Sequence, residues 1–311
     1  MAIQSSLFQP PDRKSTLRVG PAGWNYKDWE GIVYPPGRSQ DALAFLADYC
    51  DTIEINSSFY APPRPKDAAS WARRVRHNPH FRFTAKAWQR ITHESRRDDE
   101  AALAADCDVI RNSMAPLAEA GVLGAVLIQF PWRFRGTAEN REYLDTLFRH
   151  LKDFPLALEV RHSSWDNDSF YDFLRERGVA FCNVDQPVIG DSIKPGNRAT
   201  ARLGYFRLHG RNYANWFKED AGRDARYDYL YSKEEIRQLS TQIRKVHQST
   251  EETYAVTNNH FRGQALVNAM EIMEELDAAP PAVPPLLAAA YPDRFPGSAC
   301  VPPNTPKFSV P

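Results

Sequence analysis

The fold is decided by the stretch Ala157-Leu158-Glu159-Val160-Arg161-His162-Ser163-Ser164-Trp165. Side chains alternate across a β-strand, so Leu158 and Val160 face one side while Glu159 and Arg161 face the other. A carboxylate and a guanidinium are costly to bury beside an apolar core unless they pair or take part in function. The stretch therefore predicts a strand with one core face, whose other face ends in an ionisable site.

The same alternation recurs at three other places in the chain. They are Thr52-Ile53-Glu54-Ile55-Asn56, Phe81-Arg82-Phe83-Thr84-Ala85-Lys86 and Phe206-Arg207-Leu208-His209. Several strands that each end in ionisable residues indicate a barrel whose open end is a site.

Eight strand-like runs alternate with helical patterns along the chain. The strands are expected at about 17–20, 52–56, 81–86, 123–130, 156–161, 179–184, 204–209 and 253–258. The helices are expected at about 39–49, 67–77, 98–120, 138–151, 166–177, 232–246 and 261–277. The clearest start is that of the third helix, where Asp98, Asp99 and Glu100 favour an N-terminus. The connection from 185 to 203, with Pro187, Gly190, Pro195 and Gly196, lacks a good helix.

This alternation predicts an α/β fold in which parallel strands close into a TIM (β/α)8-type barrel, with its site in the loops after the strands. A doubly wound open sheet is the alternative. It is weakened because no glycine-rich phosphate loop of the expected spacing follows the first strand.

One domain accounts for the length of 311 residues, of which 42% are hydrophobic. We expect a flexible N-terminal arm over 1–15, the barrel over 16–279 and a proline-rich C-terminal tail over 280–311. Because of its prolines, the tail is expected to continue no helix or central strand, and instead to wrap the surface or be disordered.

The overall charge and the apolar runs limit the classes of partner. The net charge is zero, so no global basic field indicates nucleic acid or an acidic membrane, although a local patch stays open. No apolar run approaches a membrane span, and the N-terminus lacks a signal-peptide pattern. Four widely spaced cysteines, Cys50, Cys107, Cys182 and Cys300, form no metal-binding spacing and favour reduced thiols in a cytoplasmic protein.

In such a barrel the polar residues at the strand ends share one mouth. The residues expected to bind substrate are Trp24, Glu54, Asn56, Tyr60, Gln129, Arg161, Arg207, Arg211, Asn258 and Asn259. Together with Lys86 the arginines give this mouth a slightly cationic balance. It should therefore prefer an anionic ligand such as a phosphate or a carboxylate.

Four residues are candidates for catalysis. Glu159 is the first choice for a general acid or base; the alternative is an ion pair with Arg161, Arg207 or Lys86 that organises the barrel centre. His209 is a candidate proton shuttle, or else it bonds a backbone carbonyl. Lys86 forms a Schiff base if it is desolvated, and otherwise acts as a counter-ion.

Asp185 is the fourth candidate, as a base or a metal ligand, although Asp-Gln-Pro also favours a turn. Oxygen-rich ligation by Glu54, Glu159 and Asp185, with His209, would suit magnesium or manganese. The nearby arginines and lysine already neutralise these carboxylates. We therefore expect no cofactor and no metal, with a divalent metal as the alternative.

Aromatic residues follow several strands. The segment 20–31 after the first strand is rich in them, and Trp88, Trp165, Tyr60 and Trp216 follow others. Such rings stack on a flat ligand or form a lid over the mouth. The alternative is that they seal the top of the core.

These stretches together resemble the YecE-like family, a domain of unknown function, over about residues 17–275. The matching segments are Gly20-Pro-Ala-Gly23-Trp24 with Trp29-Glu-Gly31 and Tyr34-Pro35; Thr52-Ile-Glu54-Ile-Asn56-Ser57-Ser58-Phe59-Tyr60; Trp71; Phe83-Thr-Ala-Lys86; Ile91-Thr92-His93; Gln129-Phe-Pro131; Glu159-Val-Arg161-His162 with Trp165; Arg207-Leu-His209-Gly210-Arg211; and Asn258-Asn259 with Ala265 and Asn268-Ala269.

The resemblance implies a TIM barrel and supplies no reaction. One departure is Thr257, where the family usually has an aromatic residue before the two asparagines. The barrel is also similar in outline to sugar isomerases and apurinic endonucleases. This chain has too few histidines at its strand ends for their metal clusters, so that analogy concerns the fold alone.

Three functions compete. The first is an enzyme that performs acid/base chemistry of hydrolase, lyase or isomerase type on a small anionic substrate. The second is a nucleic-acid-associated protein that uses arginines such as Arg73, Arg74, Arg76, Arg90, Arg96 and Arg97, whose alternative is a solvated helix face. The third, a binding module without chemistry, is disfavoured by the crowded ionisable mouth.

The N-terminal arm bears on the second function. Gln4-Ser5-Ser6-Leu7-Phe8 resembles the peptide by which bacterial DNA-processing proteins dock on the replication sliding clamp, with serine in place of the usual leucine at its second position. The sliding clamp is therefore one expected partner of this arm. The alternative is a chance match of five residues.

Overall fold

A computed structural model describes residues 16–37, 41–94, 99–216, 218, 223–276 and 283–296. Its strands are β1 (Thr16–Pro21), β2 (Thr52–Ile55), β3 (Arg82–Lys86), β4 (Leu123–Gln129), β5 (Leu156–Glu159), β6 (Ala180–Asp185), β7 (Leu203–Leu208) and β8 (Glu252–Thr257). The strands pair in the order β1-β8-β7-β6-β5-β4-β3-β2, and every paired neighbour is parallel. A single bridge between Ala22 and Glu54 joins the two end strands, so the predicted TIM barrel is confirmed.

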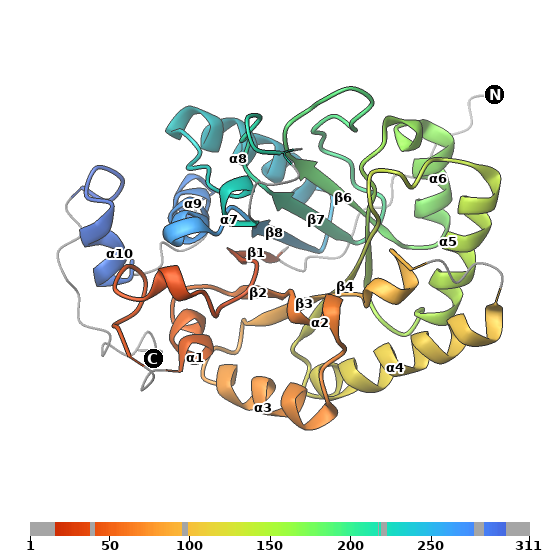
Figure 1. Ribbon diagram of the computed structural model, residues 1–311, viewed down its shortest axis with the longest axis horizontal. Coiled ribbons are helices and arrows are strands. Elements are labelled where there is room, and N and C mark those ends of the chain that lie inside the picture. The colour runs from red at the N-terminus through yellow and green to blue at the C-terminus, as the bar shows by residue number, and fades with distance from the viewer. Residues whose placement is uncertain are drawn as a thin grey trace, which may run out of the picture.

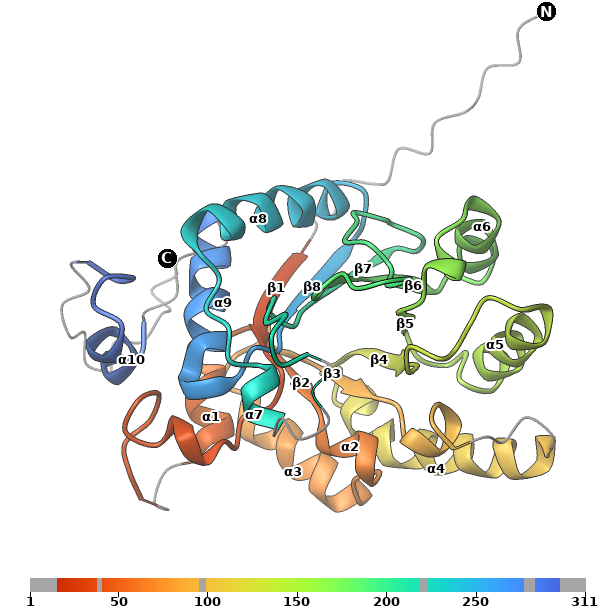
Figure 2. The same cartoon turned by 45° about the horizontal axis from the view of Figure 1, so that its top comes forward.

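Helices surround the strands on the outside of the barrel (Figures 1 and 2). The α-helices are α1 (Ala42–Ala47), α2 (Ser57–Tyr60), α3 (Pro65–Val75), α4 (Glu100–Glu119), α5 (Ala138–His150), α6 (Asp168–Glu176), α7 (Arg223–Arg226), α8 (Lys233–His247), α9 (Gln264–Glu275) and α10 (Pro285–Ala290). Short 3-10 turns are η1 (Lys27–Trp29), η2 (Gln89–Ile91), η3 (Ser163–Trp165) and η4 (Phe261–Gly263).

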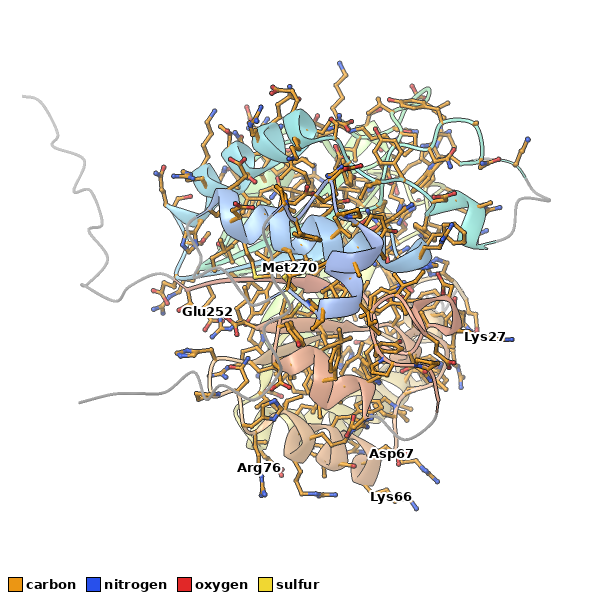
Figure 3. The ribbon with its side chains drawn as sticks, turned by 90° about the vertical axis from the view of Figure 1, so that its left-hand side faces the viewer. Lys27, Lys66, Asp67, Arg76, Glu252 and Met270 are labelled. Atoms are coloured by element: carbon orange, nitrogen blue, oxygen red, sulfur yellow. The ribbon has the colours of Figure 1, made fainter. Side chains whose placement is uncertain are left out.

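The long helices run back against the strands, as α3 illustrates. Figure 3 shows Lys27, just after β1, and Lys66, at the start of α3, at one end of the molecule. Glu252, at the start of β8, and Arg76, just after α3, lie at the other end. The carboxyl ends of the strands therefore share one mouth, which is where TIM barrels place their sites.

Polar side chains cap the starts of several helices. Asp41 accepts the amide of Ala44 at the start of α1, and Asp99 accepts that of Ala102 at the start of α4, as its predicted start required. Ser232 and Glu235 form a capping box at α8. The connection from β6 to β7 contains no helix over residues 186–202, as predicted.

Closure of the barrel depends on Gly20. A Cβ atom at this position would lie 1.9 Å from the backbone oxygen of Thr52, far inside contact distance. β1 therefore approaches β2 closely enough to close the ring only because residue 20 has no side chain. Thr257 is the last residue of β8, the neighbour of β1. Its hydroxyl donates to the carbonyl oxygen of Ala265 in α9 at 2.8 Å, which holds the end of β8 against this helix.

Two apolar layers flank the strands. One lies between the strands and the helices, and the other fills the barrel interior. The interior layer is made of Ala22, Ala125, Leu127, Ala157, Ala180, Cys182, Val184, Leu203, Tyr205, Tyr254 and Val256. Towards the mouth the interior positions become ionisable, with Glu54, Glu159 and Arg207 all buried.

The proline-rich tail corrects one expectation, because α10 lies within it. Pro285 occupies the first turn of that helix, where a proline lacks only an amide that would be unpaired anyway. The tail is tied to the barrel through Arg294, which donates to Glu271 of α9 at 2.6 Å. The short helices α2 and α7 were also not expected. The predicted helix over 261–277 is interrupted at Gly263, whose φ of 82° separates η4 from α9.

The candidate clamp-binding peptide Gln4–Phe8 lies outside the described residues. Among the described cysteines, Cys50, Cys107 and Cys182 are buried free thiols. No helix in the described ranges is both long and apolar enough to cross a membrane.

Candidate active site at the barrel mouth

An arginine at the centre of the barrel links three strands. Arg207 on β7 donates from Nη2 to Glu54 on β2 at 2.8 Å and from Nη1 to Glu159 on β5 at 2.6 Å. All three side chains are at most 2% exposed. A charge buried this deeply is tolerated because each ion has an opposite partner, so the trio forms the polar floor of the mouth.

Glu159 is held as a carboxylate by two arginines. Arg161 donates to its Oε1 from Nε at 2.9 Å and from Nη2 at 2.7 Å, while Arg207 occupies Oε2. Burial alone would raise the pKa of Glu159, but the charges of Arg207 and Arg161 outweigh it and hold this pKa well below its ordinary range. Glu159 therefore carries a fixed negative charge at neutral pH, as in the ion-pair alternative.

His209 is buried beside this carboxylate in its neutral form. The side-chain amide of Asn258 lies 2.9 Å from Nδ1 of His209, and because an amide nitrogen only donates, the imidazole proton sits on Nε2. Nε2 lies 3.7 Å from Glu159. Burial and the charge of Arg207 lower the pKa of His209 to about 3. His209 therefore stays uncharged across the physiological range.

A cavity of about 580 Å³ opens above this floor. Its lining comes from the carboxyl ends of several strands, as the barrel topology requires. The lining residues are Gly23, Trp24, Asn25, Tyr26, Asn56, Ser57, Phe59, Tyr60, Lys86, His93, Gln129, Arg161, Arg207, Tyr227, Asn258 and His260. Eight of the predicted site residues are in this set, and Glu54, Glu159 and His209 bond to members of it.

Lys86 is the cationic lining residue without an acidic partner. Its ammonium makes no hydrogen bond or ion pair with the described residues, and it lies over the ring of Phe59, 4.1 Å from the ring centre. Burial, reinforced by the charge of Arg207, lowers the pKa of Lys86 to about 7, although Glu54 and Glu159 oppose this shift. Lys86 is therefore the lining group whose proton is easily exchanged at neutral pH.

His93 stands on the wall next to Lys86. Its Nδ1 lies 2.8 Å from the Thr92 hydroxyl, and its ring meets that of Phe59 edge to face at 4.9 Å. Burial and the charge of Lys86 lower the pKa of His93 to about 4. The segment Ile91-Thr92-His93 was noted only for its family resemblance, because η2 brings it to the mouth from beyond the end of β3.

Aromatic rings form the upper walls. Trp24 packs edge to face on Trp71 at 5.3 Å, and Tyr26 stacks on His260 at 4.6 Å. Tyr60 is 65% exposed at the rim. These rings surround the opening, so a flat or sugar-like ligand would have apolar faces to contact.

The three tryptophans that follow other strands divide between the two expectations. Trp165 is fully buried in the core, which fits the sealing role. Trp88 donates its indole N–H to the Tyr60 carbonyl oxygen at 3.3 Å, and Trp216 packs on His209 at 6.0 Å. Rings such as these fix the rim and its loops.

Asp185, Arg211 and Asn259 lie apart from the cavity. The carboxylate of Asp185 accepts two bonds from Nε and Nη2 of Arg211 and one from the Tyr231 hydroxyl. Asn259 donates to Asn268 of α9 at 2.8 Å. Strand alternation explains this: Val184 points into the barrel, so Asp185 points out toward the helices, and Asn258 and Asn259 divide in the same way.

The carboxylates of Glu54 and Glu159 at the mouth are already paired with arginines. No group of three or more His, Cys, Asp and Glu side chains in the described part of the chain has an arrangement that could hold a metal.

Some of the arginines that were predicted to contact nucleic acid lie beside acidic side chains of the protein itself. Arg74 pairs with Asp41, and Arg90 lies 3.4 Å from Asp106, while Arg73 and Arg76 are exposed.

The family model described as "Protein of unknown function DUF72" matches residues 18–292. The chain belongs to this family. Its fold and its strand-end motifs therefore agree with the YecE-like resemblance noted in the sequence.

Relatives of this DUF72 protein match most of its length. The UPF0759 protein YunF of Bacillus subtilis is 30% identical over 272 residues, which cover 84% of this chain and 95% of YunF. A DUF72 family crystal structure from Thermotoga maritima has a TM-score of 0.75 at 33% identity, covering 84% of this chain and 99% of that one. One from Enterococcus faecalis has a TM-score of 0.75 at 30% identity, covering 84% and 96%.

Proposed function

We propose that this DUF72 protein is an enzyme that binds a small molecule carrying a phosphate or carboxylate in the mouth cavity and exchanges a proton with it through Lys86. The observation that carries the proposal is the convergence of Lys86, Arg161 and Arg207 on one cavity. The two carboxylates behind them, Glu54 and Glu159, leave a surplus of one positive charge when Lys86 is protonated. A surplus cation in a concave, partly apolar site favours an anionic ligand.

The roles that we propose for these residues follow from their charges. Arg161 uses Nε and Nη2 on Glu159, and its Nη1 makes no hydrogen bond with the described residues, so Nη1 is available to a ligand anion. Glu159 keeps Arg161 and Arg207 in place and does not itself exchange protons near neutral pH. Lys86, with a pKa of about 7, supplies the general acid or base.

A thermal-shift experiment tests this function. The probes are inorganic phosphate, glycerol 3-phosphate and pyruvate, with glycerol as the neutral control. A ligand at one hundred times its Kd stabilises the folded state by about 2.7 kcal/mol, which raises the Tm of a chain of this size by about 4 °C. We expect that shift with an anion in the wild type and in Lys66→Met, and its loss in Lys86→Met.

Lys66 is the matched control because it is an exposed lysine at the same end of the molecule (Figure 3). Equal stabilisation of the wild type and Lys86→Met, or stabilisation by none of the anions, would contradict the proposal. Salt-sensitive stabilisation by short DNA alone would favour the nucleic-acid alternative, which stays a prediction.

A further inference from the structure

We propose that Lys86 is a nucleophile that forms a Schiff base with an aldehyde or ketone bearing the anionic group. This inference rests on the function proposed above and adds the chemical class of the substrate. It assigns Lys86 a covalent step in addition to proton exchange.

The position of the amine is the first argument. Lys86 ends β3, and its own carbonyl oxygen accepts the Ser58 hydroxyl at 2.7 Å, which fixes the base of the side chain. Its ammonium reaches the cavity beside the ring of Phe59 and meets no carboxylate or hydrogen-bond acceptor among the described residues. A structural lysine in a barrel interior would be expected to pair, as Arg207 does with two carboxylates.

The environment of the amine is the second argument. Nucleophilic lysines are neutral, and they become so by desolvation or by a neighbouring cation. Lys86 has both, because it is partly buried and Arg207 and Arg161 lie close enough to oppose its charge. With a pKa of about 7, about half of its amine is neutral at pH 7, whereas an exposed lysine is neutral only about once in three thousand molecules.

The chemistry balances without any other reactant. The neutral Nζ attacks the carbonyl carbon, and the electron pair of the C=O bond moves to the oxygen, which takes up a proton. The resulting carbinolamine then loses its oxygen as water, with both hydrogens derived from the amine, and a C=N bond remains. Arg161, through the Nη1 that bonds to none of the described residues, is placed to hold the phosphate or carboxylate of the same molecule.

The first experiment measures the reactivity of the amine with a probe that needs no specific recognition. Full-length protein is treated at pH 7 with isotope-labelled formaldehyde and cyanoborohydride, and methylation at each lysine is followed by peptide mass spectrometry. We expect Lys86 to react at least tenfold faster than Lys66, with a rate that rises with pH around a midpoint near 7. A rate at Lys86 equal to or below that at Lys66 would overturn the proposal.

The second experiment traps the adduct. Dihydroxyacetone phosphate or pyruvate is added with borohydride, and we expect one reduced adduct per chain, on Lys86, that is absent from Lys86→Met and competed by inorganic phosphate. Absence of an adduct on Lys86 with both ketones would refute the Schiff base. If phosphate nevertheless stabilises the wild type and not Lys86→Met, the anion site stands and only the covalent step fails.

Discussion

Replacement of Lys86 by methionine should stabilise this protein. The ammonium is partly buried at the cavity wall and has no acidic partner among the described residues, so folding removes much of its hydration without an ion pair in return. Methionine has a similar length and no charge, and it can keep the contact with the Phe59 ring. The lysine is thus expected to lower the stability of the fold.

The magnitude follows from the pKa of Lys86, which falls from 10.5 to about 7 on folding. At about 1.4 kcal/mol for each unit of pKa, the charged amine costs up to about 5 kcal/mol, and about 4 kcal/mol at pH 7 where it is half neutral. The contact with Phe59 offsets about 1–2 kcal/mol of this cost. We therefore expect the Lys86→Met variant to be about 2–3 kcal/mol more stable at pH 7.

The pH dependence distinguishes this mechanism from a packing effect. A lysine whose folded pKa is depressed destabilises fully below about pH 7, and its effect disappears as pH rises toward 10.5, where the amine is neutral in both states. Urea unfolding at pH 7 and pH 9.5 measures the difference between variant and wild type. A difference that is absent, or that does not shrink at pH 9.5, would refute the reasoning; Lys66→Met, on the surface, should stay within about 0.5 kcal/mol.

Three further predictions concern the buried ions and the closure of the barrel. Glu159→Gln should lower the free energy of unfolding by about 3–5 kcal/mol at pH 7. Because the pKa of Glu159 is depressed in the folded protein, this cost should fade as the pH falls below 4.5. A cost in urea unfolding that does not change with pH would contradict the fixed charge. Arg207→Met leaves the buried carboxylates of Glu54 and Glu159 without their shared partner and should lower the free energy of unfolding by at least as much. A urea midpoint close to that of the wild type would contradict this prediction. Gly20→Ala should prevent folding or cost more than about 3 kcal/mol by calorimetry, whereas Gly196→Ala, whose Cβ would meet nothing closer than 3.8 Å, should stay within about 1 kcal/mol.

The sequence was sufficient for the barrel because its signals are local. Period-two alternation placed the β5 segment as a strand with Glu159 facing inward, and that alternation also fixes which face joins the interior. The same rule, applied to Cys182 and Val184 on β6, indicates that Asp185 faces outward. Including Asp185 in the mouth treated it as a loop residue, whereas it is the last residue of the strand.

The state of the site was not accessible from sequence, because it depends on contacts between strands far apart in the chain. Arg207 occupies the carboxylates of β2 and β5, and for this reason we propose Lys86, and not Glu159, as the group that exchanges protons. His93 reaches the wall through a turn after β3, a feature without periodicity. The positions of Arg207 and His93 at the mouth therefore depend on the closed barrel, and the sequence of a single segment does not predict them.

The single bridge between β1 and β2 has a consequence for the motions of the molecule. Every other neighbouring pair of strands is joined by a ladder, so this junction has the fewest cross-strand hydrogen bonds to resist transient opening. Amide hydrogens here should exchange with solvent sooner than those of β7 and β8. The loops that leave the junction, 23–26 and 56–60, both line the cavity, so a molecule bound against both of them would tie the two ends of the sheet together and slow that exchange.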